Sequence, residues 1–233
     1  MFDNLIIAYC HLFVLRCSAH ILKFLLPLTI LLNSCGTTQQ DGWKLASEFH
    51  ENYANEFIHN EELLKYIYNP RAHFYFNTHD EAPTFRALIH DTTELRVIIF
   101  ENQDRFIQEF KLELDTFPSF GEATVRRENG ELKLVVDDSL EIEILNFEKD
   151  PLTHFKKLRK LINKYGIVTY GKLRIGGIIE VYITANDYLL YFPANYKIEE
   201  PQFDERWRKK QKKGKQLDQN WFYYHSDKPL DFG

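Results

Sequence analysis

ATVRRENGELKLVV, residues 123–136, is the stretch that decides the fold. Apolar and polar residues alternate in both of its halves, which is the pattern of a half-buried β-strand. The halves are joined by Asn129 and Gly130, and such a pair readily adopts the positive φ angles of a tight type I′ turn. We therefore predict a β-hairpin with strands at 123–128 and 131–136.

Strand-like sequence continues on both sides of this hairpin. Leu140, Ile142 and Ile144 alternate with glutamates, which predicts a third strand of the same meander. Between 106 and 114 the apolar residues lie mostly on one parity, so we predict another half-buried strand there. Further segments rich in aromatic and β-branched residues are also predicted as strands, at 71–76, 84–90, 95–101, 167–173, 178–184, 188–192 and 220–225.

Three segments carry the apolar spacing of an amphipathic helix. From Trp43 to Phe57 the apolar residues recur three to four positions apart. A shorter helical run at 61–68 is stopped by an Asn-Pro pair, because the residue before a proline is pushed out of the α region. The clearest helix is at 151–165, where Asp150 can cap the start and Gly166 suits the end.

Together these elements predict an α+β fold: a mostly antiparallel, bent β-sheet with N-terminal helices and one further helix packed on it. A parallel α/β sheet would need a helix between most strands, and only one predicted helix falls inside the strand region. We expect a single domain at 43–233, preceded by a polar tether at 36–42. A chain of this length is long enough to bury a sizeable core.

The first 35 residues have the order of a secretory leader, with a cation, an apolar run and then small residues. Lys23 precedes the run at 24–32, which closes in Leu32-Asn33-Ser34-Cys35. This segment, residues 21–36, resembles the signal peptide and lipobox of bacterial lipoproteins. The resemblance implies cleavage before Cys35, acylation of that cysteine with fatty acids such as palmitate, and attachment to a membrane of the cell envelope. Gly36, in place of an aspartate after the cysteine, implies the outer membrane.

An uncleaved N-terminal anchor is the alternative interpretation of the leader. It would bury Arg16 and Lys23 at a cost of a few kcal/mol each. Neither apolar stretch before Cys35 reaches the roughly 20 residues that a membrane helix needs. Cleavage would also remove Cys10 and Cys17, so the mature chain would form no internal disulfide and would depend on its core for stability.

The predicted mature chain is acidic. Removing Arg16, Lys23 and Asp3 with the leader leaves 27 basic and 33 acidic residues. A domain that binds nucleic acid is usually basic overall, so we expect no nucleic-acid partner.

One segment, 206–215, is strongly basic although the chain is acidic, with seven cations in ten residues. We interpret it as a contact site for an anionic surface, such as lipid headgroups, lipopolysaccharide phosphates or another acidic envelope component. The candidate contact residues are Arg206, Trp207, Arg208, Lys209, Lys210, Lys212, Lys213 and Lys215. The alternative is a solvated loop or helix end whose cations offset the acidic residues at 199–205.

Catalytic and metal-binding patterns are weak. His73 and His90 in neighbouring predicted strands suggest a metal site, although histidines bonded to backbone or water are the plainer interpretation. Glu141 and Glu143 share a strand face about 6.6 Å apart, near the carboxylate spacing of an inverting glycosidase, but any solvent-facing strand alternates in this way. The sequence contains neither a serine-nucleophile elbow nor a phosphate-binding glycine pattern. We therefore expect no cofactor and no metal.

These features predict a lipid-anchored envelope lipoprotein that acts as a non-enzymatic binding or structural module. The alternative is an envelope hydrolase for glycan, peptide or ester substrates, with a site assembled from distant strands. A cleft that holds two or more titratable groups with shifted pKa values would favour the hydrolase. A flat sheet with aromatic patches would favour binding.

Overall fold

The computed structural model describes residues 38–231, except for 72, 77–82, 90–92, 118, 137–138, 173–175, 195 and 200. The chain divides into two compact units, Met1–Asp41 and Gly42–Gly233, and the second unit contains the sheet. The predicted leader with Cys35, and the His90 of the metal hypothesis, lie outside the described residues. Within them, no helix is both long enough and apolar enough to cross a membrane.

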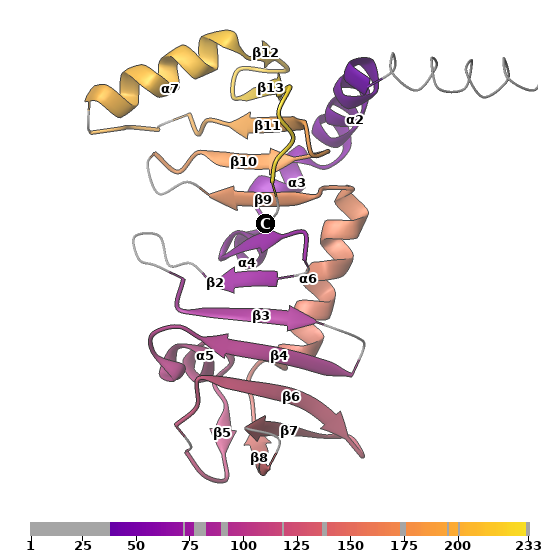
Figure 1. Cartoon of the computed structure of the whole chain (residues 1–233), viewed down its shortest axis with the longest axis vertical. Helices are drawn as coiled ribbons and strands as arrows, with labels where there is room; N and C mark the ends of the chain where they lie inside the picture. Colours follow the sequence, from indigo (N-terminus) through magenta and orange to yellow (C-terminus); the bar gives the residue numbers. More distant parts are fainter. Residues whose placement is uncertain are drawn as a thin grey trace, which may run out of the picture. The chain divides into compact units, whose positions relative to one another are not determined.

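The second unit is built on one antiparallel sheet flanked by helices, as the α+β prediction requires (Figure 1). The strands lie in the order β12-β13-β11-β10-β9-β1-β2-β3-β4-β6-β7-β8-β5. Their bounds are β1 Tyr66–Asn69, β2 His73–Phe76, β3 Phe85–Ile89, β4 Glu94–Ile99, β5 Glu113–Leu114, β6 Glu122–Glu128, β7 Glu131–Val136, β8 Leu140–Asn146, β9 Thr169–Lys172, β10 Ile179–Tyr182, β11 Asp187–Tyr191, β12 Lys215–Gln216 and β13 Trp221–His225. The helices are α2 Thr38–Asn52, α3 Ala54–Ile58, α4 Glu61–Leu64, α5 Gln103–Phe110, α6 Pro151–Tyr165 and α7 Pro201–Lys213.

The long helix α6 connects the two halves of this sheet (Figure 1). Strands β1 to β8 fill the sheet from its centre to one end, α6 returns along one face, and β9 pairs with the free side of β1. Strands β9 to β13 then fill the other end. At about 1.5 Å per residue α6 is about 22 Å long, and it contacts β3, β4 and β6.

The hairpin of β6 and β7 forms as predicted. Asn129 and Gly130 have φ angles of 50° and 92°, both positive as a type I′ turn requires. Val125 lies opposite Leu134 in the register, and both side chains are fully buried. The residues before them, Thr124 and Lys133, point to the other face and are partly exposed.

Both ends of α6 carry the caps that the sequence predicts. The Asp150 carboxylate accepts hydrogen bonds from the backbone N–H groups of Leu152 and Thr153. The helix ends at Gly166, whose φ of 64° lies in the left-handed region. A side-chain cap of this kind stabilises a helix by about 1 kcal/mol.

The inner face of α6 packs on the middle of the sheet. Phe155 is fully buried, with its ring centre 5.1 Å from that of Tyr66 and 5.4 Å from that of Phe74. Burying a phenylalanine side chain stabilises a fold by about 1.5–3 kcal/mol relative to leaving it exposed. The predicted packing of this helix on the sheet is therefore confirmed, but the prediction of one further helix was too few, because α5 and α7 are present as well.

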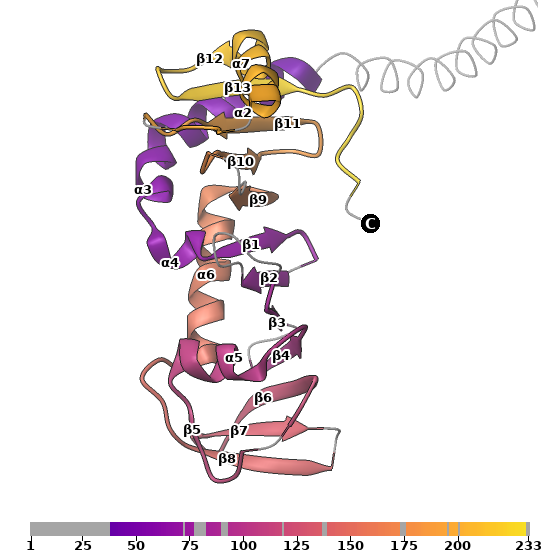
Figure 2. The same cartoon turned by 90° about the vertical axis from the view of Figure 1, so that its left-hand side faces the viewer.

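The N-terminal helices cover the same face of the sheet as α6 (Figure 2). The helix α2 starts inside the predicted tether, so residues 38–42 are helical. Phe49 of α2 has its ring centre 6.0 Å from that of Trp221 in β13. Phe57 of α3 lies 5.3 Å from Tyr170 in β9 by the same measure. These contacts join the start of the domain to strands that come much later in the chain.

Two predictions about local structure were wrong. Residues 66–68, which we predicted as the end of a helix at 61–68, belong to strand β1, because they pair with β2 on one side and β9 on the other. Residues 103–110 form helix α5, which takes up the first part of the strand that we predicted at 106–114. The Asn102 side chain caps this helix, and Phe106, Ile107 and Phe110 are buried on one helical face. The strand prediction counted apolar residues at alternate positions, so it did not include Ile107.

Helix α7 packs on the face opposite α6. Leu189 and Tyr223 belong to the main core, whereas the adjacent Leu190 and Phe222 belong to a second cluster that includes Trp207 of α7. Successive strand residues point to opposite faces of a sheet. The end of the sheet that contains β11 and β13 is therefore covered on both faces.

Candidate functional site

The predicted basic segment, 206–215, forms the end of α7 and leads into β12. Trp207 is half-buried, with its ring centre 6.4 Å from that of Phe192. A Cβ atom on Gly214 would lie 2.6 Å from the ring of Tyr224, so helix and sheet meet here without room for a side chain. The segment is therefore a docked helix and not a solvated loop.

Lys210 also points toward the sheet, into a cage of aromatic rings. Its ammonium lies 5.1 Å from the ring centre of Tyr188, 4.9 Å from that of Trp207 and 5.8 Å from that of Tyr224. It also pairs with Glu180 at 3.7 Å, and its carbonyl accepts a hydrogen bond from the Tyr224 hydroxyl at 2.8 Å. A cation over an aromatic face is stabilised by about 0.5–2 kcal/mol. Trp207 and Lys210, two of the eight predicted contact residues, thus hold α7 on the sheet.

The remaining cations of α7 face solvent. Arg208 pairs with Asp204 at 2.6 Å, and Lys209 pairs with Glu205 at 2.6 Å, each one helical turn apart. Exposed pairs of this kind contribute about 0–1 kcal/mol, so either cation can exchange its partner for another anion. Within the described part of the chain, no ion pair involves Arg206, Lys212 or Lys213.

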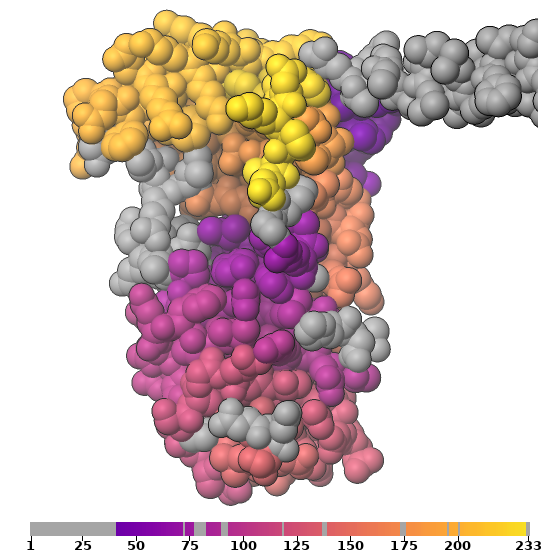
Figure 3. All heavy atoms as spheres, in the orientation of Figure 1, coloured from indigo at the N-terminus to yellow at the C-terminus, as the bar shows by residue number. Residues whose placement is uncertain are grey.

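One side of α7 borders a groove of about 470 Å³. The described side chains that line it are Gln202, Glu205, Arg206, Lys209, Lys210 and Lys213. Each has another member of the set three or four positions away, so the six side chains share one side of the helix. Four of these six side chains are cations. Figure 3 shows the residues of α7, coloured gold, at the surface at the upper left of the view.

The basic segment ends beside the first residues of the domain. The Lys215 ammonium lies 3.2 Å from the ring centre of Trp43, and that ring lies 5.3 Å from the ring of Tyr223. Trp43 follows Cys35 by eight residues, a span of at most about 29 Å. The end of α7 therefore contacts a residue that is only eight positions from Cys35 along the chain.

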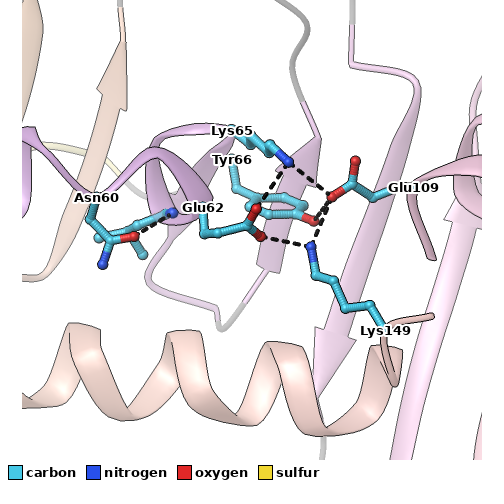
Figure 4. Close-up of polar contacts among 7 residues, drawn as sticks. Asn60, Glu62, Lys65, Tyr66, Glu109 and Lys149 are labelled. Carbon is cyan, nitrogen blue, oxygen red and sulfur yellow. Dashed lines mark hydrogen bonds and ion pairs between the residues drawn. The ribbon is translucent and has the colours of Figure 1, made fainter.

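A second polar cluster, which the sequence analysis missed, joins α4, α5 and the segment before α6 (Figure 4). Lys149 lies between two carboxylates, 2.7 Å from Glu62 and 3.0 Å from Glu109. Lys65 contacts the same two carboxylates at 3.1 and 3.6 Å. The Tyr66 hydroxyl donates a hydrogen bond to Glu109 at 3.4 Å. Two cations and two carboxylates thus alternate in a cluster without net charge.

The surroundings of this cluster shift several pKa values. Burial alone raises the pKa of Glu62, but hydrogen bonds from Lys149 and Lys65 outweigh it and lower that pKa to about 2. Burial lowers the pKa of His154 from 6.5 to about 4, and the charge of Lys149 adds to this effect. Burial raises the pKa of Tyr66 well above its usual value. At neutral pH, Glu62 is therefore charged and His154 is neutral.

A cleft of about 410 Å³ opens beside the cluster, and both Glu62 and His154 line it. Two titratable groups with shifted pKa values in one cleft are the observation that we expected to favour the hydrolase alternative. The direction of the shifts argues against it, because a general acid or base works best with a pKa near the working pH. Both shifts move away from neutrality. The cluster fits an ion-pair network that joins α4, α5 and the segment before α6 better than an acid–base pair.

A third polar cluster surrounds the buried Asp187 at the start of β11. Its carboxylate accepts hydrogen bonds from Thr184 at 2.6 Å, Tyr223 at 2.5 Å and His225 at 2.8 Å. Burial raises the pKa of Asp187, but these hydrogen bonds outweigh it and lower the pKa. A Cβ atom on Gly42 would lie 2.2 Å from the same carboxylate. The cluster therefore fixes the start of α2 against β11 and β13.

The other candidates from the sequence are dispersed. Glu141 pairs with Lys133 at 3.1 Å, and Glu143 lies opposite that lysine in the register, as on a solvent-facing strand. His73 lies in β2, while its proposed partner falls in a segment outside the description. Among the residues that the structure describes, no group of three or more metal-ligating side chains occurs.

The chain matches no protein-family model, and no curated protein or solved structure is similar to it. Its function is therefore argued from its own residues and their geometry.

Proposed function

We propose that this chain is a lipid-anchored lipoprotein of the cell envelope, held at the outer membrane by acylated Cys35. Its domain would be a non-enzymatic binding module that contacts an anionic membrane surface through α7. The observation that carries this proposal is the row of solvent-facing cations on a helix whose other side is packed on the sheet.

The sizes of the interaction energies favour a role for α7 in orienting the domain at the membrane. Each cation near an anionic membrane contributes about 1 kcal/mol of attraction. The outward-facing cations are Arg206, Arg208, Lys209, Lys212 and Lys213, so their sum is on the order of 5 kcal/mol before screening by salt. Acyl chains contribute about 0.8 kcal/mol per buried methylene and suffice for attachment. The helix would therefore set which face of the domain meets the lipid.

The position of the basic segment supports the same role. The contact between Lys215 and Trp43 brings the end of α7 next to the first residues of the domain. A helix far from the anchor could reach the bilayer only if the whole domain lay flat on it. A helix beside the anchor can meet lipid phosphates in many orientations of the tether.

The hydrolase alternative has less support. Its best cleft offers Glu62 with a pKa of about 2 and His154 with a pKa of about 4. Neither group is suited to exchange protons near pH 7.

Vesicle binding tests the proposed contact. A soluble form that begins at Thr37 is mixed with vesicles of phosphatidylcholine containing phosphatidylglycerol, at increasing salt. The variant replaces Lys209, Lys212 and Lys213 by Gln, and Lys210 is kept because it holds α7 in place. A matched control replaces Lys156, Lys157 and Lys160 of α6 by Gln.

We expect the α7 variant to bind at least tenfold more weakly at physiological salt, and the α6 control to change less than twofold. Binding by the wild type should weaken steeply as salt rises, because exposed charges are screened beyond about 8 Å at physiological ionic strength. The proposal is wrong if the wild type does not bind anionic vesicles, or if the α6 control weakens binding as much as the α7 variant.

A further inference from the structure

The cations of α7 are not spread evenly around the helix. Arg206, Lys209 and Lys213 line the groove on one side, whereas Arg208 and Lys212 do not. Arg206 and Lys213 are seven residues apart, which is about 10 Å along a helix axis. A single small ligand can therefore contact this whole set.

One of the side chains that line the groove, Glu205, is itself an anion. The Glu205 carboxylate lies 2.6 Å from Lys209, and the pair is well exposed. The hydrogen bond from Lys209 lowers the pKa of Glu205, so this carboxylate is charged at neutral pH. An exposed pair contributes little to stability. A ligand with a higher negative charge can therefore replace Glu205 as the partner of Lys209.

The helix that carries the groove is fixed before any ligand arrives. Trp207 packs on Phe192, Gly214 meets Tyr224 without space for a side chain, and Lys210 lies in its aromatic cage. A site that is already in place loses little conformational freedom when it binds. The packing of α7 thus favours a defined site over a diffuse charged surface.

The charge of the lining favours a doubly charged anion. Lys210 is paired with Glu180, and the other three lining cations, Arg206, Lys209 and Lys213, still outnumber the single carboxylate of Glu205. A phosphomonoester carries about −1.5 to −2 charges at pH 7 and offers three acceptor oxygens, whereas the phosphodiester of phosphatidylglycerol carries one charge. An arginine can also bind a phosphate group through two parallel hydrogen bonds.

We propose that this groove binds the phosphomonoester headgroup of a membrane lipid. The inference rests on the proposed function and narrows it from a charged surface to one site with one ligand class. The groove volume of about 470 Å³ is within the usual range of ligand pockets, about 300–1,000 Å³, and so leaves room for the glycerol or sugar that carries the phosphate. Lipid is the source that fits, because the basic segment ends beside Trp43 near the predicted anchor.

Calorimetric titration of the full chain in dodecyl maltoside micelles tests this site. The ligands are dioctanoyl phosphatidate, dioctanoyl phosphatidylglycerol and inorganic phosphate. A groove variant, Arg206→Gln with Lys213→Gln, is compared with an outer variant, Arg208→Gln with Lys212→Gln. Each variant removes one arginine and one lysine from α7, so the net charge of the two proteins is the same.

We expect the groove variant to bind phosphatidate at least tenfold more weakly than the wild type, and the outer variant to bind within twofold of it. Glu205→Gln should tighten binding several-fold, because it removes the competing carboxylate. The wild type should bind phosphatidylglycerol at least tenfold more weakly than phosphatidate. All variants should keep the wild-type melting temperature within about two degrees, as surface substitutions usually do.

The other outcomes overturn the inference in distinguishable ways. Equal weakening by the groove and outer variants would mean diffuse attraction, which removes the site but leaves the proposed function standing. Equal affinity for the two lipids would remove the phosphomonoester preference. Inorganic phosphate that binds as tightly as phosphatidate would make free phosphate the ligand. Failure of the wild type to bind either lipid would contradict both the site and the proposed function.

Discussion

His154 should make the domain less stable in mild acid. Its side chain is only 8% exposed and lies between Tyr66 and Phe110, with each ring centre 5.7 Å away. Its Nε2 atom has no hydrogen-bond partner among the described residues. The charged groups around it are Lys149, Glu62, Lys65 and Lys157, of which three are cations. This surrounding disfavours the imidazolium form.

The size of the effect follows from the two pKa values. The unfolded chain takes up the proton near pH 6.5, whereas the folded chain takes it up only near pH 4. The unfolded state therefore binds more protons between these values, and stability falls as the pH drops. One pH unit corresponds to about 1.4 kcal/mol, so the loss is about 2 kcal/mol at pH 5 and about 3 kcal/mol once both states are protonated. Above pH 6.5 the histidine is mostly neutral in both states, so this loss of stability is absent.

Urea unfolding at pH 7 and pH 5 measures this loss. His154→Leu keeps a buried side chain of similar size without a titrating ring, and His59→Leu is the control because His59 is exposed. We expect the free energy of unfolding of the wild type and of His59→Leu to fall by about 2 kcal/mol more than that of His154→Leu. Glu62 does not confuse the comparison, since its lowered pKa costs stability only below pH 4.5. Equal losses in the three proteins would refute the reasoning.

Two further substitutions test the packing around α7 and α2. Tyr223→Phe removes a buried hydrogen bond to the Asp187 carboxylate, so thermal or urea unfolding should show a loss of about 1.5–3 kcal/mol; an unchanged stability would contradict the assigned contact. Lys210→Met removes the cation from the aromatic cage and should cost about 1–2 kcal/mol. Limited proteolysis should then cut the variant within α7 faster than the wild type, and an unchanged rate would argue against the cage as the clamp.

The elements that the sequence predicts well are those with complete local signals. The hairpin needed only the alternation around Asn129 and Gly130, and α6 needed only its apolar stripe and the caps at Asp150 and Gly166. All of these signals lie within one segment, so no distant partner had to be known.

The elements that we did not predict from the sequence depend on distant partners, or have an apolar spacing that we assigned to a strand instead of a helix. β1 is a strand because Tyr68 pairs with Tyr170, about a hundred residues later. The cluster around Lys149 draws Glu62 and Glu109 from separate helices, so no spacing in the sequence could reveal it. The bend of the sheet and the processing of the leader stay predictions.

The state of Cys35 tests the central claim most directly. We predict that the protein purified from its native host begins at Cys35, carries fatty acids on that residue by mass spectrometry, and takes up a labelled fatty acid in growing cells. Cys35→Ser should leave an uncleaved precursor that takes up no label. A wild-type protein that retains residues before Cys35, or that carries no lipid, would contradict the anchor and with it the placement of α7 at a membrane.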